Sequence, residues 1–265
     1  MRMFWKSHRL AALALGLSAA TSSAASAATI AALQDGTTIV WIDTDQKKVT
    51  GSVKLAGGAS LVGMDVRPAD GRLYGLAPDG AIVTVDAKTG VWLKVSQLSE
   101  ALPAGVPIAV DFNPVADRMR VIGGNGLNLR VNVIDGKTTV DGTLKYVPTD
   151  AAMSKTPMVT AAGYTNSMAG AKETALYDLD TTTGTLLKQA PPNDGVLTTV
   201  GSLGVKLDGP AAFDVWSDGM GKHMGWLLSG GRLHTVDLGT GVATLVGPIA
   251  GLKGRVTDIA LLPAM

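Results

Sequence analysis

Residues 111–132, DFNPVADRMRVIGGNGLNLRVN, repeat without a gap the pattern of residues 65–86, DVRPADGRLYGLAPDGAIVTVD. The offset is 111 − 65 = 46 residues. Asp, Pro, Arg, Gly and Val recur at matching places, with apolar residues between them. Internal repetition at such a period is typical of repeat architectures, so the stretch is one copy of a structural unit.

Further copies of the unit run through the rest of the chain. Residues 159–167 with 175–204 form a third copy, and residues 211–218 with 225–247 form a fourth. Each holds four short alternating runs separated by turn residues, a pattern typical of β-strands. The acids are 20 Asp and only two Glu. Asp bonds turn amides, whereas Glu favours helices, so the composition also indicates strands and turns.

The two chain ends supply a fifth copy in two pieces. Residues 256–263, VTDIALLP, match the first strand of the unit, and residues 29–55 match the other three. The last strand of the chain therefore completes a sheet that the first strands begin. This pattern predicts an all-β fold, a five-bladed β-propeller with four antiparallel strands per blade and a first blade closed by the C-terminal strand. A β-sandwich of the same hairpins is the alternative, but it does not explain the split copy.

The first 27 residues have the three parts of a Sec-type signal peptide. A basic start precedes an apolar run at residues 10–17 and the small-residue motif Ala-Ser-Ala at 25–27. The apolar run is shorter than the roughly 20 residues that span a bilayer. We expect cleavage after Ala27, a single propeller domain over residues 28–265, and a periplasmic or extracellular product.

Charge and cysteine content exclude several classes of protein. Without its three signal cations the chain has 23 − 3 = 20 Lys and Arg against 22 Asp and Glu. This balance gives no basic surface for nucleic acid or anionic membrane. The absence of Cys excludes disulfides, thiolate metal sites and a Cys nucleophile. No later segment is long and apolar enough for membrane insertion, so none is expected after cleavage.

One set of residues recurs in the same register of the units: Asp65, Asp111, Asp214 and Asp258, with Gly163 in the remaining copy. A group that every blade needs is more plausibly structural than catalytic, and a central cation site is the alternative. The series Asp111, Asn113 and Asp117 has cation-like spacing but lacks the other ligands of a calcium loop. Calcium is therefore a weak candidate, and no other cofactor is predicted.

Function is expected where the copies differ. The polar residues left after subtracting one copy from another fall mainly at the propeller end that holds the first and third hairpin turns of each blade. The ligand-binding candidates are Asn113, Asp117, Arg118, Asn132, Tyr164, Asn166, Asn193 and Asp194. Such groups suit a polar small molecule, a glycan or a protein partner. The alternative is that the extra Asn and Asp complete longer turns. Asn125 and Asn128 are expected at the opposite end.

Residues 111–132, 159–167, 175–204 and 234–247 resemble a family of secreted bacterial proteins described as domain of unknown function 4394. The resemblance covers nearly the whole mature chain and implies a repeated β-architecture and export, but no reaction. The residues that it singles out are Asp111, Asn113, Asp117, Arg118, Arg120, Asn128, Arg130, Tyr164, Asn166, Asn193 and Asp194.

These observations favour an exported, non-enzymatic binding or interaction module. The alternative is a propeller glycosidase or lactonase that uses the inner-strand carboxylates. Its acid would not be a Glu, because Glu100 and Glu173 lie in connecting segments. A redox metalloenzyme has little support, since the mature chain has only His223, expected in a loop, and His234, expected in a strand. No nucleophile-elbow motif indicates a serine hydrolase triad.

Overall fold

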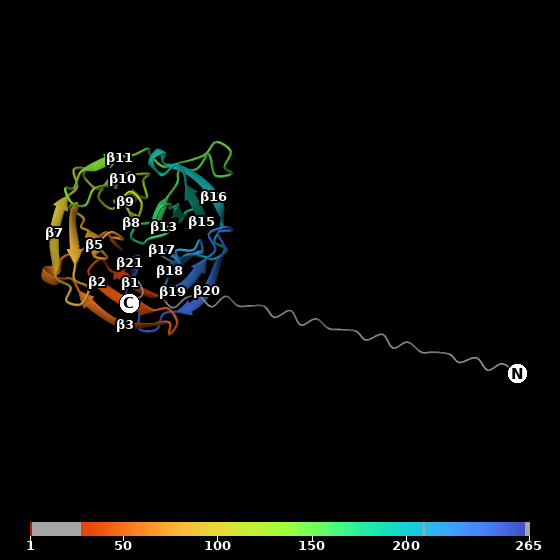
Figure 1. The fold of residues 1–265 in the computed structure, drawn as a ribbon, viewed down its shortest axis with the longest axis horizontal. Coiled ribbons are helices and arrows are strands. Elements are labelled where there is room, and N and C mark those ends of the chain that lie inside the picture. The colour runs from red at the N-terminus through yellow and green to blue at the C-terminus, as the bar shows by residue number, and fades with distance from the viewer. Residues whose placement is uncertain (2–27, 209, 263–265) are drawn as a thin grey trace.

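The computed structural model describes residue 1, residues 28–208 and residues 210–262, and almost all of its regular structure is β. The predicted signal peptide lies outside the described residues. The strands group into five sheets arranged as a ring (Figure 1). The sequence-based prediction of a five-bladed β-propeller is confirmed.

Each blade has four main strands, in order from the innermost to the outermost. The first holds β21 (Val256–Leu261), β1 (Thr29–Gln34), β2 (Thr38–Asp43) and β3 (Lys48–Lys54). The second holds β4 (Gly63–Val66), β5 (Leu73–Leu76), β6 (Ala81–Val85) and β7 (Trp92–Gln97). The third holds β8 (Ile108–Asn113), β9 (Arg118–Gly123), β10 (Asn128–Val131) and β11 (Thr138–Val140).

The fourth blade holds β13 (Val159–Tyr164), β14 (Leu176–Asp180), β15 (Thr185–Gln189) and β16 (Val196–Ser202). The fifth holds β17 (Ala211–Ser217), β18 (His223–Ser229), β19 (Arg232–Val236) and β20 (Ala243–Pro248). A short strand, β12 (Lys145–Tyr146), pairs in parallel with β16 and adds a fifth strand to the fourth blade. The repeat pattern did not predict β12, because it belongs to a connection that the other copies lack. Two short 3-10 helices, η1 (Ala56–Gly58) and η2 (Pro192–Asp194), lie in connections.

The C-terminal strand closes the ring. Strand β21 pairs antiparallel with β1, with Ala260 opposite Ala31 and Ile259 opposite Ala32. The strand that ends the described chain is thus the innermost strand of the first blade. This pairing confirms the interpretation of the split fifth copy.

The turns show why the repeat carries Gly and Asp. The second hairpin turn of each blade holds a glycine with positive φ, from 63° at Gly184 to 91° at Gly126, where a Cβ is disfavoured. In the third hairpin turn of four blades an acid or amide accepts backbone N–H bonds: Asp86 Oδ1, for example, accepts them from Lys88 and Thr89 at 2.8 and 3.1 Å. The repeated residues therefore specify hairpins.

Apolar clusters lie between every pair of neighbouring blades. Phe112 and Tyr74, for example, pack edge to face with ring centroids 5.5 Å apart in the cluster between the second and third blades. Trp226 is 1% exposed between the fifth and first blades. Burying each such side chain contributes roughly 1.5–3 kcal/mol, so the blades are held face to face mainly by the hydrophobic effect.

Backbone hydrogen bonds also join the blades at their outer edge. The third hairpin of each blade is hydrogen-bonded to the segment that follows the outermost strand of the preceding blade. The pairs are Ala56 N with Gly90 O, Ser99 N with Gly136 O, Gly142 N with Asn193 O, Ala243 N with Leu203 O, and Ala250 N with Lys47 O, at 2.8–3.2 Å. Strand twist accumulates across a blade, and it carries the outer hairpin over its neighbour.

Candidate functional site

The repeated inner-strand carboxylates bond to backbone. In four of the five blades the Asp accepts an N–H bond from an adjacent inner strand. The pairs are Asp258 with Met64 at 2.9 Å, Asp65 with Phe112 at 2.8 Å, Asp111 with Tyr164 at 3.2 Å, and Asp214 with Leu261 at 2.6 Å. Gly163 holds this place in the fourth blade, where a Cβ would lie 3.0 Å from the Val215 side chain. We call Asp65, Asp111, Asp214 and Asp258 the carboxylate belt.

Burial disfavours the charged form of the belt carboxyls. It raises the pKa of Asp214 to about 6. Burial and the neighbouring Asp214 raise the pKa of Asp65 well above its usual value. Burial and Asp65 do the same to the pKa of Asp111. These shifts follow from removing carboxylates from water and placing like charges near one another.

The belt does not gather into a metal site. Within residues 28–208 and 210–262 no group of three or more His, Cys, Asp or Glu side chains is arranged to hold a metal ion. The weak calcium candidates Asp111, Asn113 and Asp117 each bond to protein groups: Asp111 to Tyr164 N, Asn113 to turn amides, and Asp117 to Arg67.

Three of the predicted ligand-binding residues stabilise turns. Asn113 Oδ1 accepts N–H bonds from Val115 and Ala116 at 2.9 and 2.8 Å. Asn132 Oδ1 accepts the amide of Ile134 at 3.1 Å. Arg118 Nη1 donates to a turn carbonyl, Asp117 O, at 2.8 Å. These contacts match the alternative that extra Asn and polar residues complete longer turns.

The other predicted residues have separate surroundings. Asp117, with φ of 50°, forms an ion pair with Arg67 of the second blade, 2.5 Å between Nη2 and Oδ2. Asn166, also left-handed with φ of 56°, donates its backbone N–H to Ser217 Oγ at 2.8 Å. Asp194 is exposed in η2. The structure brings Tyr164 and Asn193 together through Arg120.

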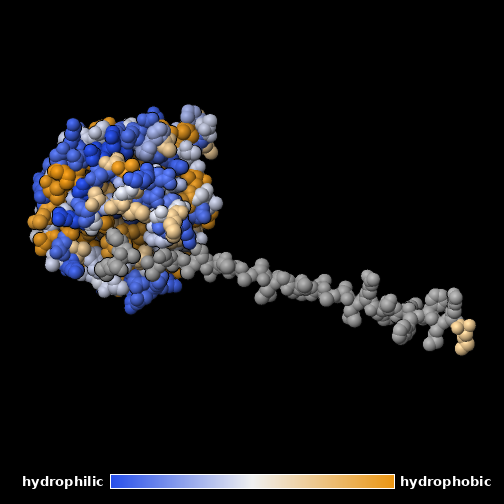
Figure 2. All heavy atoms as spheres, viewed as in Figure 1, coloured by the Kyte–Doolittle hydropathy of each residue, from blue (hydrophilic) through white to orange (hydrophobic). Residues whose placement is uncertain are grey.

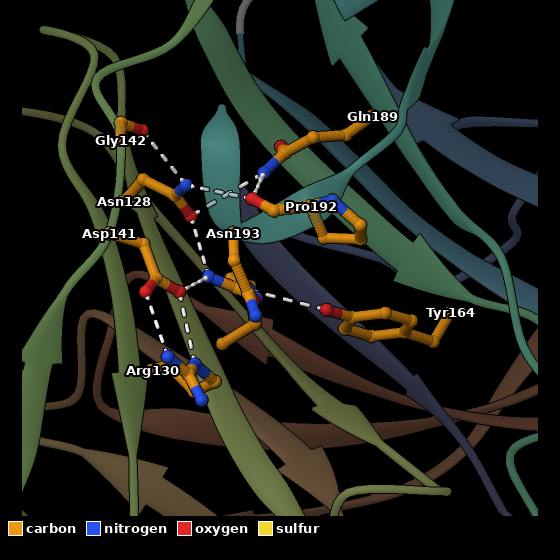
Figure 3. A network of polar contacts seen from close by, with 9 residues as sticks. Asn128, Arg130, Asp141, Gly142, Tyr164, Gln189, Pro192 and Asn193 are labelled. Carbon is orange, nitrogen blue, oxygen red and sulfur yellow. Dashed lines mark hydrogen bonds and ion pairs between the residues drawn. The ribbon is translucent and has the colours of Figure 1, made fainter. Parts of the chain in front are cut away.

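Arg120 is the centre of a buried polar network between the third and fourth blades. Figure 3 labels its partners Asn128, Asp141, Tyr164 and Asn193. Arg120 is 2% exposed. Its guanidinium donates to Tyr164 Oη at 3.2 Å, to Asn128 Oδ1 at 2.8 Å, to Asp141 Oδ2 at 2.7 Å and to Asn193 Oδ1 at 2.8 Å. Arg130 reaches the same Asp141 carboxylate from the surface, with bonds of 3.0 and 3.1 Å. These hydrogen bonds and ion pairs fix the position of the third blade relative to the fourth.

Asn128 belongs to this network, although we expected it at the opposite end from Asn193. Its Nδ2 donates to Pro192 O and Gly142 O, both at 3.0 Å. The expectation was wrong because twist carries the third hairpin of the fourth blade across the third blade. Residues that strand order assigns to opposite ends of the propeller can therefore come into contact at its outer edge. Asn125 stays in its own turn, where Oδ1 accepts the Leu127 amide at 3.2 Å.

Beside Arg120 the network leaves buried oxygens unsatisfied. Asp178 is 0% exposed, and neither carboxyl oxygen has a hydrogen-bond partner among the described residues. Gln189 Oε1 has none there either. Burial raises the pKa of Asp178 to about 8, although Arg120 opposes the shift. The carboxyl is therefore mostly protonated at neutral pH.

Two hollows lie on the propeller axis, one at each end. The larger, which we call the wide cavity, has a volume of about 670 Å³ and lies where the inner strands begin. All five blades line it, through residues that include Asp35, Leu61, Ile108, Thr160, Ala211 and Arg255. Among the described residues, the buried Thr160 hydroxyl has no hydrogen-bond partner.

The second hollow, which we call the narrow pocket, lies where the inner strands end. Its volume is about 410 Å³. Its lining includes Asp65 and Asp214 of the belt, the loop residues Ser167 to Ala169, and Ser217. None of the eight predicted ligand-binding residues lines the wide cavity or the narrow pocket. The comparison of the copies therefore singled out Tyr164 and Asn193 of the network between blades but none of the residues that line these hollows.

The two histidines among the described residues lie in strands of the fifth blade. His223 begins β18 rather than lying in a loop, and its Nδ1 is 2.8 Å from Ser217 Oγ. Pairing with β17 extends β18 to this residue. His234 lies in β19, as expected, and burial lowers its pKa.

Comparison with known proteins assigns the family. A family model described as "Domain of unknown function (DUF4394)" matches residues 38–260. The chain belongs to the DUF4394 family. No curated protein matches this DUF4394 chain.

Several solved structures are similar to the DUF4394 chain. A structural genomics protein of unknown function from Bacteroides thetaiotaomicron is similar with a TM-score of 0.51 and 16% identity, over 90% of this chain. The DUF4394 chain spans 65% of the length of that protein. A protein of unknown function from Bacteroides caccae has a TM-score of 0.46 and 11% identity, over 90% of this chain and 100% of its own. An auxiliary nutrient binding protein from Bacteroides ovatus has a TM-score of 0.46 and 16% identity, over 74% of this chain and 52% of its own.

Proposed function

We propose that the protein is an exported binding protein that holds a small ligand in the wide cavity. The observation that carries this proposal is a hollow of about 670 Å³ to which all five blades contribute. Ligand sites in proteins are concave and usually measure roughly 300–1,000 Å³. The belt carboxylates, by contrast, accept backbone N–H bonds, so the geometry gives less support to a hydrolase that uses them.

The lining of the wide cavity defines the chemistry of the ligand. Leu61, Val106, Ile108 and Met158 give it apolar walls. The exposed Arg255 side chain has no ion pair among the described residues. A small molecule with an apolar body and one anionic group would match this lining.

Export is the second part of the proposal. The basic start, short apolar run and small-residue motif at residues 1–27 support it. In the described chain no helix is long and apolar enough to cross a membrane. The face seen in Figure 2 mixes hydrophilic and hydrophobic residues. Expression of the full chain followed by cell fractionation should give a periplasmic or extracellular protein that begins at Ala28. A cytoplasmic product that keeps Met1 would contradict export.

Binding is tested with 8-anilinonaphthalene-1-sulfonate, which has an apolar body and one anionic group. We expect the purified protein to bind the dye and raise its fluorescence. Ser60→Trp, which fills the wide cavity, should abolish binding, and Arg255→Gln should weaken it about tenfold, the loss of one charge-assisted contact. Ser52→Trp, on the exposed face of β3, is the matched control. Equal binding by all four proteins would contradict the proposal. If the parent protein binds the dye as expected, displacement of the dye by small carboxylates would identify ligands.

A further inference from the structure

A serine that lines the narrow pocket is hydrogen-bonded to a histidine, and the proposed binding function uses neither residue. Ser217 ends β17 and His223 begins β18, and the two residues are directly opposite in the antiparallel pair. Ser217 Oγ lies 2.8 Å from His223 Nδ1. Both residues are half-buried, and Ser217 lines the narrow pocket. A hydroxyl within hydrogen-bond reach of an imidazole is the basic arrangement of an activated nucleophile.

A third group sets the direction of the Ser217 hydrogen bond. The Asn166 backbone N–H donates to Ser217 Oγ at 2.8 Å. The hydroxyl proton is therefore left to point at His223 Nδ1, which accepts it when the imidazole carries its proton on Nε2. Asn166 holds a left-handed φ of 56° to make this contact. Non-glycine residues in that region are uncommon and cluster at functional sites.

The surroundings supply the other elements of acyl transfer. In the part of the chain that the structure describes, the backbone amides of Ser167 and Ala169 donate to no protein group, and both residues line the narrow pocket. Such amides stabilise an oxyanion. Asp218 follows Ser217, and the Met220 and Lys222 amides, with a contribution from His223, lower the pKa of its carboxyl.

We propose that Ser217 and His223 are the nucleophile and general base of an esterase site that accepts a small ester or lactone in the narrow pocket. Ser217 Oγ forms a bond to the carbonyl carbon while its proton passes to His223 Nδ1. The carbon–oxygen bond of the ester then breaks, and His223 gives the proton to the departing alkoxide. Water hydrolyses the acyl-serine with His223 again as base, which restores the hydroxyl and releases the acid. This site lies at the opposite end of the axis from the wide cavity and does not depend on it.

The experiment measures hydrolysis of p-nitrophenyl acetate and p-nitrophenyl butyrate by the purified protein. Ser217→Ala and His223→Gln should each lower kcat/KM by about 100-fold or more. Ser52→Ala, on the exposed face of β3, should leave it unchanged. A fluorophosphonate probe should label the parent at Ser217, as mapped by peptide mass spectrometry. Labelling uses the unaltered protein, so it does not depend on whether a variant folds.

The absence of Cys from the chain allows an independent readout. Ser217→Cys and Ser52→Cys each introduce one thiol, and their alkylation by iodoacetamide can be followed as a function of pH. We expect Ser217→Cys to react with a lower apparent pKa, and adding His223→Gln to remove the difference. Parent protein that is neither labelled nor active, or hydrolysis equal in the Ser217→Ala variant, would overturn the proposal.

Discussion

The carboxylate of Asp258, in the last described strand, accepts the backbone N–H of Met64 at 2.9 Å and so joins the end of the chain to the second blade. Its other oxygen accepts the Ile259 amide at 3.0 Å. One side chain thus satisfies two buried donors. The belt is a set of inter-blade hydrogen bonds, and its four members explain why one residue type recurs in the same register.

Asp258→Ala should reduce the free energy of unfolding by about 1–3 kcal/mol, because it leaves buried amides without an acceptor. Burial raises the folded-state pKa of Asp258 above its unfolded value, so the carboxylate itself costs stability as pH rises. The loss should therefore be largest below the unfolded pKa of about 3.8 and shrink as the pH rises. Urea unfolding followed by tryptophan fluorescence measures it. Asp258→Asn keeps one acceptor and should lose less; a loss that grows with pH would refute this explanation.

The fold could be predicted from the sequence because its information is repeated. The Asp at position 65 recurs at position 111, the turn glycines recur in every unit, and the two chain ends together repeat the unit once more. An error in interpreting one copy is therefore corrected by the others. The candidate site was harder, because it depends on contacts between different blades. Asn128 and Asn193 both bond to Arg120 because strand twist displaces a hairpin, and the Ser217–His223 pair follows from the register of one strand pair. No spacing in the sequence encodes these distances.

Asp178 should make stability depend on pH in a defined direction. Its folded pKa of about 8 exceeds the usual value of 3.8, so the folded state binds the proton more tightly. Stability contributed by the protonated form is complete below about pH 4 and is lost as pH rises to about 8, by up to roughly 1.4 kcal/mol per pH unit. Asp178→Leu, which has the same branching, should flatten this slope and raise the melting temperature at pH 8. Parallel pH profiles for parent and variant would contradict it.

The two arginines that share Asp141 should differ in their contribution to stability. Arg120→Ala removes the buried cation beside Asp141 and the donor to Asn128 Oδ1, and it should cost about 3–5 kcal/mol. Arg130→Ala is the matched control: that side chain is 35% exposed, and its removal should cost about 1 kcal/mol or less. Chemical denaturation of both variants tests this. Equal losses would show that Arg120 is not the centre of the network.

Gly136 should reveal the contact between outer hairpins. It has φ of 72°, and a Cβ there would overlap the carbonyl of Gln97 in the preceding blade. Gly184 has a similar φ of 63° but nothing within 4 Å of an added Cβ. Gly184→Ala should therefore cost about 1–2 kcal/mol of backbone strain, and Gly136→Ala clearly more. Thermal unfolding compares them, and equal melting temperatures would argue against this contact in solution.

Ring closure by β21 is the claim on which both axial hollows depend, and an engineered disulfide tests it directly. The chain has no Cys, and Ala31 is opposite Ala260 while Ala32 is opposite Ile259. Adjacent antiparallel pairs alternate between Cα separations of about 4.5 and 5.5 Å, both within the range that a disulfide spans. At least one of the double variants Ala31→Cys/Ala260→Cys and Ala32→Cys/Ile259→Cys should therefore cross-link on mild oxidation of folded protein, with a mass loss of two hydrogens. Ala31→Cys/Ala243→Cys, which joins unpaired strands, should not. Folded protein in which neither paired variant cross-links, or in which the unpaired control does, would contradict a ring closed by the C-terminal strand.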